Sequence, residues 1–123
     1  MQAQIHHITT YNGIVGAVLR QRREQMGLEQ SQIAQRLGLT QSSYSRIESG
    51  KTSLTLLQLS DMAQHFGMNP HGFVAQVEHI KIDMQRQGIE VSPEKAPGLG
   101  EGVTNLLIGA TLLAVVTQMM RNS

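Results

Sequence analysis

The amino-acid sequence predicts an all-α fold, and three observations support that prediction. The chain has 123 residues, of which 40% are apolar and 15% charged, a balance typical of one compact globular domain. Four glycines (Gly27, Gly38, Gly50 and Gly67) each follow a segment whose apolar residues repeat with helical period, as helix-ending glycines do. Almost no stretch alternates apolar and polar residues with period two, so no sheet is expected.

The first part of the chain is expected to hold five helices. Thr40 offers an N-cap hydroxyl to the third helix and Ser53 to the fourth, and Asn69 followed by Pro70 is a typical start for a longer fifth helix. The resulting predicted helices cover residues 15–26, 30–37, 41–49, 54–66 and 70–88. Residues 1–13 precede them as an amino-terminal arm in which His6 and His7 lie on a frayed terminus, and residues 70–91 form a long helix that packs on the domain.

The second part of the chain begins with a linker. Two prolines and three glycines fall within residues 92–102, a composition typical of an extended connection. Residues 103–120 then contain no charged side chain. Because a helix of this kind cannot lie exposed in water, residues 103–123 are expected to form an apolar helix that is buried against protein or lipid.

Two interpretations of this apolar helix remain open. It could be an oligomerisation helix, buried between subunits or against the long helix that ends near Gly88. It could instead anchor the chain in a membrane, with Gly109, Ala110 and Ala114 as positions of close helix approach. The densely apolar stretch is shorter than a bilayer requires, which favours oligomerisation. A dimer is the simplest assembly, since the amino-terminal module is not expected to have a groove for this helix.

The central feature of the sequence is a pair of short helices joined by a tight turn, residues 30–37, 38–40 and 41–49. A turn this short forces the helices to cross steeply, so the second presents its amino-terminal side outward. Apolar residues on both sides of the turn can fix the crossing, and the small Ala34 allows the two backbones to approach closely.

From about Val15 to Asn69 the chain resembles the Cro/C1-type helix-turn-helix family, also called the xenobiotic-response-element family. The residues that carry the resemblance are Leu19-Arg20-x-x-Arg23, Gly27-Leu28-x-Gln30, Ile33-Ala34-x-x-Leu37-Gly38-Leu39-Thr40-Gln41, Ser45-Arg46-Ile47-Glu48-x-Gly50-Lys51, and then Leu54, Leu57, Leu59 and Ala63. The resemblance implies a five-helix lambda-repressor-like fold whose helix-turn-helix domain covers residues 14–69. It also implies binding to double-stranded DNA, with the second helix of the pair in the major groove and usually as a dimer.

The resemblance also implies which residues contact DNA. Base-reading residues of the family fall at Gln41, Ser42 and Arg46 in this sequence. Their chemistry agrees, since a glutamine amide can read adenine and an arginine fork can read guanine. The phosphate-contacting positions are Gln30, Ser43, Ser49 and Lys51. Arg23 and Glu48 match a structural ion pair between helices, and Tyr44 matches an inward packing position, with its hydroxyl expected at the edge of the core.

The charge distribution favours two modules acting together. Up to Asn69 there are six basic and four acidic side chains, whereas from Pro70 onward there are four basic and five acidic ones. The basic residues therefore lie with the expected DNA module, but thinly, and one module alone would bind DNA weakly.

Several classes of function are not expected. The chain has no Cys, which excludes disulfides and thiol nucleophiles and fits a reducing, cytoplasmic location. Its five histidines form no i,i+4 pair, and no catalytic, metal-binding or phosphate-cradling motif occurs, so neither an enzyme, a cofactor nor a small-molecule substrate is indicated. The sequence thus predicts a sequence-specific DNA-binding regulator, a repressor that acts as a dimer on a near-palindromic operator. The alternatives are a membrane-tethered interaction protein and an antitoxin-type regulator with a protein partner.

Overall fold

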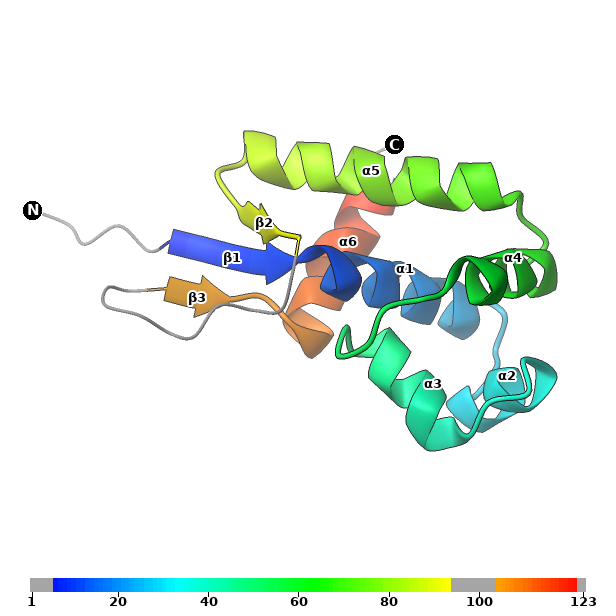
Figure 1. Ribbon diagram of the computed structural model, residues 1–123. Coiled ribbons are helices and arrows are strands. Elements are labelled where there is room, and N and C mark those ends of the chain that lie inside the picture. Colours follow the sequence, from blue (N-terminus) through cyan, green and yellow to red (C-terminus); the bar gives the residue numbers. More distant parts are fainter. Residues whose placement is uncertain (1–5, 94–103, 122–123) are drawn as a thin grey trace, which may run out of the picture.

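A computed structural model describes residues 6–93 and 104–121. Within these ranges the chain forms six helices and three short strands (Figure 1). In chain order they are β1 (His6–Thr10), α1 (Tyr11–Gln25), α2 (Gln30–Arg36), α3 (Gln41–Glu48), α4 (Leu56–His65), α5 (Pro70–Arg86), β2 (Glu90–Ser92), β3 (Thr104–Leu106) and α6 (Gly109–Arg121). The mostly helical fold predicted from the sequence is confirmed, and its first five helices are those of the helix-turn-helix module.

The expectation of no sheet is wrong, because the three strands form a small parallel sheet in the order β2-β1-β3. Ile8 in the central strand is in register with Glu90 on one side and Leu106 on the other. The two outer strands have three residues each, which is too short for a period-two pattern to stand out. Both outer strands are far from β1 along the sequence, so no local sequence pattern predicts the pairing.

The first residues of the described chain are not a free arm. β1 ends at Thr10, whose side chain accepts a hydrogen bond from the Gly13 backbone N–H at 2.9 Å and so caps α1. Thr9 is buried, and its hydroxyl donates to the Leu107 carbonyl at 2.9 Å. His6 and His7 therefore belong to the central strand, and the predictions of a frayed terminus there and of an arm up to residue 13 are wrong.

The caps of the later helices follow the sequence with one exception. Thr40 caps α3 by accepting from the Ser43 N–H at 3.0 Å, and Asn69 caps α5 by accepting from the His71 N–H at 2.8 Å, as predicted. The cap of α4 is Thr55 and not Ser53, because the Thr55 hydroxyl accepts a hydrogen bond from the Gln58 backbone N–H at 3.1 Å. The fifth helix ends at Arg86, short of residue 91, because the chain turns at Gly88 and enters β2.

The carboxy-terminal segment is a strand followed by a helix, not one helix over residues 103–123. β3 covers Thr104–Leu106, and α6 begins at Gly109, whose φ of 59° lies in the left-handed region. Most of the predicted linker, residues 94–102, lies outside the described residues. In the described part of the chain, no helix combines the length and the apolar character needed to span a bilayer.

The apolar side of α6 is covered by the same chain. The helix packs mainly against α1 and also against α5 (Figure 1), with Leu112, Val116 and Met119 buried in the common core. A Cβ added at Gly13 would lie 3.2 Å from the Leu112 side chain, so this glycine of α1 gives Leu112 the room to approach. The expectation that the amino-terminal module has no groove for this helix is therefore wrong.

The core lies where α1 meets the other helices. Its fully buried members are aliphatic apart from Tyr44 and Phe73, as the low aromatic content implies. The largest of these side chains are Tyr44, Phe73, Ile14, Leu19, Ile33, Met62, Ile80, Met84 and Leu112. They come from α1 to α6, so the helix-turn-helix, the long helix and the carboxy-terminal helix share one core.

Candidate nucleic-acid interface

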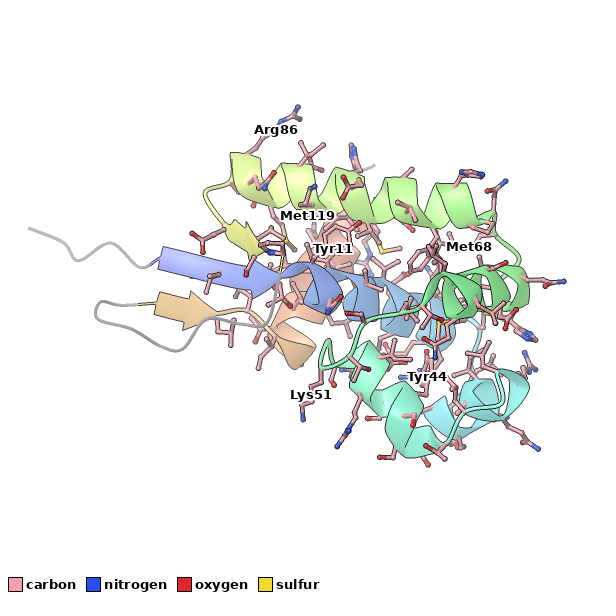
Figure 2. All side chains as sticks on the ribbon, in the orientation of Figure 1. Tyr11, Tyr44, Lys51, Met68, Arg86 and Met119 are labelled. Atoms are coloured by element: carbon pink, nitrogen blue, oxygen red, sulfur yellow. The ribbon has the colours of Figure 1, made fainter. Side chains whose placement is uncertain are left out.

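Helix α3 presents a polar face to solvent. Tyr44, Ile47 and Glu48 are buried on its inner side. The residues predicted to read bases, Gln41, Ser42 and Arg46, are all exposed, as are Ser43, Ser49 and Lys51 among those predicted to contact phosphate. The structure therefore brings six of the seven predicted residues onto one solvent-facing stretch of α3 and the turn that follows it. In Figure 2, Lys51 projects outward from that turn.

The tight turn between α2 and α3 sets this orientation. Gly38 adopts a φ of 69°, and the Leu39 backbone N–H donates to the Ala34 carbonyl at 2.9 Å, which closes the end of α2. This is the usual role of a glycine just after a helix, because left-handed backbone is costly for residues with a Cβ. Ile33 and Ala34 are buried beneath the turn, so the crossing of the two helices is packed as well as hydrogen-bonded.

A buried ion pair joins α1 to the end of α3. Arg23 Nε and Nη2 each donate to a different carboxylate oxygen of Glu48 at 2.8 Å, and Arg23 Nη1 donates to the Leu28 carbonyl at 2.8 Å. The predicted structural role of this pair is confirmed. Burial alone would raise the pKa of Glu48, but the hydrogen bonds from Arg23 and Gln30 outweigh it and hold the pKa below its usual value. The carboxylate therefore stays ionised and fixes α3 against α1.

Gln30 has a role that the sequence did not reveal. It is the first residue of α2, is half-buried, and its Nε2 donates to Glu48 Oε1 at 3.1 Å. The structure thus separates Gln30 from the six exposed residues and gives it a partner on α3. A glutamine amide carries two N–H donors, so one of them is left after this bond is made.

Tyr44 is packed more deeply than expected. The ring is fully buried, and its hydroxyl is enclosed rather than at the edge of the core. Burial raises the pKa of this phenol. Tyr44 therefore acts as a core residue on the inner side of α3 and is not available for contact with a base.

Two glycines allow α1 to lie directly against the end of α3. A Cβ at Gly16 would overlap the backbone carbonyl of Glu48, and a Cβ at Gly50 would lie 2.7 Å from the Gly13 Cα. Gly50 was expected only to end a helix, and Gly16 was not singled out. A glycine inside a helical pattern is the one signal that could have marked Gly16 as a site of close backbone approach.

A shallow cleft of about 210 Å³ lies beside the exposed face, between α1, α3 and the start of α6. Its polar lining includes Arg20, Gln30, Ser45 and Ser49, and Gly109 at the start of α6 forms part of the rim. Arg20 and Ser45 were not among the predicted contact residues, although both lie in the motifs that carried the resemblance. Arg20 Nε is 3.0 Å from Glu24 Oε1 in an exposed pair.

The two cations at the end of α3 have no acidic partner in the part of the chain that is described. There, neither Arg46 nor Lys51 forms an ion pair with a carboxylate, unlike Arg20 and Arg23. The Lys51 backbone N–H donates to the Arg46 carbonyl at 2.8 Å, so the turn holds the two residues near each other. The face thus combines hydrogen-bonding side chains with unneutralised positive charge, which is the chemistry that suits a nucleic acid.

Comparison with known proteins agrees with this geometry. Residues 19–73 match the family model described as helix-turn-helix. The clp gene regulator ClgR from Corynebacterium glutamicum is similar in fold in two crystal structures. The first has a TM-score of 0.58 at 17% identity, covering 63% of this chain and 82% of that one. The second has a TM-score of 0.52 at 17% identity, covering 56% and 90%.

A further similar structure is the restriction-modification controller protein C.AhdI from Aeromonas hydrophila. It has 26% identity and a TM-score of 0.47, and the match covers 51% of this chain and 94% of that one. The chain matches no curated protein. The ClgR structures support the fold of the five-helix module, and the family match identifies residues 19–73 within it as a helix-turn-helix domain.

Proposed function

Because residues 19–73 form a Cro/C1-type helix-turn-helix domain, which is a DNA-binding domain, we propose that this protein is a transcriptional repressor that recognises a specific double-stranded DNA sequence. The observation that carries the proposal is the exposed polar face of α3, held outward by the buried Arg23–Glu48 pair. A repressor of this kind acts by occupancy, since a protein seated on an operator excludes the polymerase.

Three side chains read bases in the proposed complex. Arg46 donates a fork to guanine O6 and N7, Gln41 pairs with adenine, and the short Ser42 lets the helix enter the major groove. Each good bidentate contact discriminates by about 1–3 kcal/mol against a wrong base. The exposure of all three residues and the absence of a carboxylate partner for Arg46 among the described residues support these roles.

The remaining predicted residues hold the DNA backbone. Ser43, Ser49 and Lys51 flank the base-reading face, and Gln30 uses the N–H that its bond to Glu48 leaves over. Contacts of this type fix the register of the protein on the duplex without reading sequence. Arg20 lines the same cleft as Gln30 and Ser49, which makes it an additional candidate for a phosphate contact.

The protein acts as a cytoplasmic homodimer on a near-palindromic operator. The helix-turn-helix half of the chain carries only six basic against four acidic side chains, so one copy gains little from phosphate neutralisation. Two linked copies bind far more tightly without any new kind of contact. The carboxy-terminal helix was expected to mediate this dimer, but its apolar side is used within the chain, so the burial argument no longer favours that surface.

The proposal is tested by selecting bound sequences from a random duplex pool and then comparing Arg46→Ala with the unmodified protein. The expected result is an inverted repeat, together with loss of preference at one position of each half-site in the variant. Arg86→Ala is the matched control, because Arg86 lies on α5, away from α3 (Figure 2). A pool that returns no enriched sequence at low salt would contradict the proposed function, and an unchanged preference in Arg46→Ala would remove Arg46 from base reading.

A further inference from the structure

A polar cleft of about 420 Å³ lies where α1, α5 and α6 meet, and no described residue of α3 lines it. Its described lining includes two arginines, Arg22 of α1 and Arg121 of α6, and no carboxylate. The remaining lining residues are Gln21, Gln25, Gln76, Thr117 and Met120. The volume is in the range of sites that hold small molecules. We call this site the arginine cleft.

Arg22 is held in place without being neutralised. Its Nη2 donates a hydrogen bond to the side-chain carbonyl oxygen Oε1 of Gln76 at 2.9 Å. The other two arginines of α1, Arg20 and Arg23, each pair with a glutamate. In the described part of the chain, neither Arg22 nor Arg121 forms an ion pair. Because an amide orients a guanidinium but carries no charge, the positive charge in the cleft remains uncompensated.

Two buried polar atoms at the cleft have no hydrogen-bond partner among the described residues, Arg22 Nε and Gln21 Oε1. A buried donor of a charged group that makes no bond is unfavourable, and such a group calls for a partner. In the adjacent Arg23, the same two nitrogens, Nε and Nη2, together bind the carboxylate of Glu48. The corresponding nitrogens of Arg22 have only the uncharged Gln76 between them, so this guanidinium keeps its capacity for an oxyanion.

We propose that the arginine cleft binds a small anionic molecule that carries a carboxylate or phosphate group. The oxygens of this group accept hydrogen bonds from the guanidinium groups of Arg22 and Arg121, and the Gln25 amide and the Thr117 hydroxyl supply further bonds to the ligand. Because the cleft contains two positive charges and its described lining contains no negative one, a ligand with two negative charges is preferred.

An occupied cleft has a structural consequence for α6. Its lining comes from α1, α5 and α6, so a bound anion links Arg121 near the end of α6 to Arg22 on α1. A ligand that binds only when these helices are docked stabilises the docked state. The concentration of the anion therefore sets how firmly α6 is held against the helix-turn-helix module. None of the lining residues is among those proposed to contact DNA, and the inference does not depend on the proposed function.

The test is calorimetric titration of the full chain at low salt with inorganic phosphate and, separately, with succinate. Sodium chloride at matched ionic strength is the reference. At least one of the two anions is expected to bind with a dissociation constant of about 1 mM or lower, which charge-assisted hydrogen bonds to two arginines can supply. Binding of phosphate alone identifies a phosphate-bearing ligand, and binding of succinate alone identifies a carboxylate-bearing one. Amide hydrogen exchange in α6 is expected to slow when the anion is bound.

Gln76→Glu is the decisive variant, because it offers Arg22 a carboxylate within the chain, as Glu48 does for Arg23. It is expected to fold normally, checked by circular dichroism, and to weaken anion binding by at least about 10-fold, since its carboxylate competes for the guanidinium. Gln85→Glu makes the same charge change at an exposed residue of α5 outside the cleft and is expected to bind like the unmodified chain.

Arg22→Gln removes the cation itself and is also expected to weaken anion binding by at least about 10-fold. Arg36→Gln is its control, since Arg36 is an exposed arginine on α2 and does not line the cleft. Three outcomes would each overturn the proposal: neither anion binds beyond the chloride reference, both cleft variants bind like the unmodified chain, or the controls weaken binding equally. Unchanged exchange in α6 with the anion bound would place the ligand elsewhere and overturn it too.

DNA binding is measured separately so that the two proposals can fail independently. Without added anion, Gln76→Glu is expected to bind DNA with the affinity and sequence preference of Gln85→Glu. Loss of DNA affinity in Gln76→Glu alone would assign the cleft to the DNA backbone and overturn the small-anion site. A chain that binds the anion in the cleft but shows no sequence preference would uphold the site and contradict the repressor function.

Discussion

At the scale of single residues, the position of the proposed recognition helix depends on one carboxylate. Glu48 receives two hydrogen bonds from Arg23 and one from Gln30, and so ties α3 to both α1 and α2. A buried charge that loses its partners is strongly destabilising, typically by about 3–5 kcal/mol. The exposed face of α3 therefore keeps its position only while this ion pair is intact.

Replacement of Glu48 is expected to remove a pH-dependent part of the stability. The pKa of Glu48 is lower in the folded chain than its ordinary value of 4.5, so the ionised carboxylate stabilises the fold above that pH. This contribution is lost as the pH falls through the folded-state pKa. At pH 7 the free energy of unfolding of Glu48→Gln should be about 3 kcal/mol lower than that of the unmodified chain. This difference should become smaller well below pH 4.5.

The measurement is urea unfolding of both proteins between pH 7 and pH 3. Glu24→Gln serves as the control, because Glu24 is exposed and its pair with Arg20 lies at the surface. That variant should change stability by less than about 1 kcal/mol at any pH. A difference between Glu48→Gln and the unmodified chain that stays constant with pH would show that ionisation of Glu48 does not contribute.

At the scale of elements, the close contact between α1 and the end of α3 is set by Gly16. Alanine is the better helix former by up to about 1 kcal/mol, so a glycine here has a packing reason. A Cβ added at Gly16 would overlap the Glu48 backbone carbonyl, which cannot move without displacing α3. The contact thus determines both the stability of the module and the placement of its exposed face.

Gly16→Ala is expected to destabilise the fold by at least about 2 kcal/mol, since a rigid backbone atom must shift to admit the methyl group. Gly72→Ala is a matched control within α5, where an added Cβ would meet nothing within 4 Å. It should leave stability unchanged or raise it by up to about 1 kcal/mol. Thermal unfolding of the two variants distinguishes them, and equal effects would argue against the close contact.

The sequence predicted the helices well and the strands not at all. Helical period, glycines and caps are local signals, and they placed the cores of α1 to α5 and the caps Thr40 and Asn69. The pairing of β1 with β2 and β3 depends on residues about 80 to 100 positions apart, for which a single sequence carries no signal. The same holds for α6, whose apolar character was evident but whose packing on α1 was not.

Only some features of the candidate site could likewise be predicted from the sequence. The exposure of Gln41, Ser42 and Arg46 followed from their spacing on a short helix. The bond from Gln30 to Glu48 and the cleft that contains Arg20 did not, because both depend on how three separate elements meet. Side chains on one helix face can be predicted from a sequence, whereas contacts between faces need the fold.

At the scale of the whole molecule, the low net charge limits how strongly the protein can bind DNA. The formal net charge of the chain is only +1 at pH 7. In the proposed complex, affinity from phosphate neutralisation therefore comes from a few well-placed cations and from the pairing of two copies. Each such cation should contribute measurably to the salt dependence of binding.

Lys51→Ala is expected to weaken DNA binding about equally on all sequences and to make the salt dependence shallower. The slope of the logarithm of affinity against the logarithm of salt concentration should fall in magnitude by about 0.9 for each bound copy. Arg86→Ala, which removes a cation from α5, should leave the slope unchanged. Fluorescence anisotropy titrations at several salt concentrations provide the measurement, and an unaltered slope in Lys51→Ala would exclude a phosphate contact there.

The central place of β1 in the sheet has a consequence for how the chain is made in a cell. During synthesis β1 acquires one neighbour only after residues 90–92 have emerged from the ribosome, and the other only after residues 104–106. Until these segments have emerged, the nascent polypeptide carries an unpaired segment and an uncovered side of α1. The nascent chain can complete the contacts of β1 and α1 only after the segment that forms α6 has emerged, and the five-helix module lacks these contacts until then.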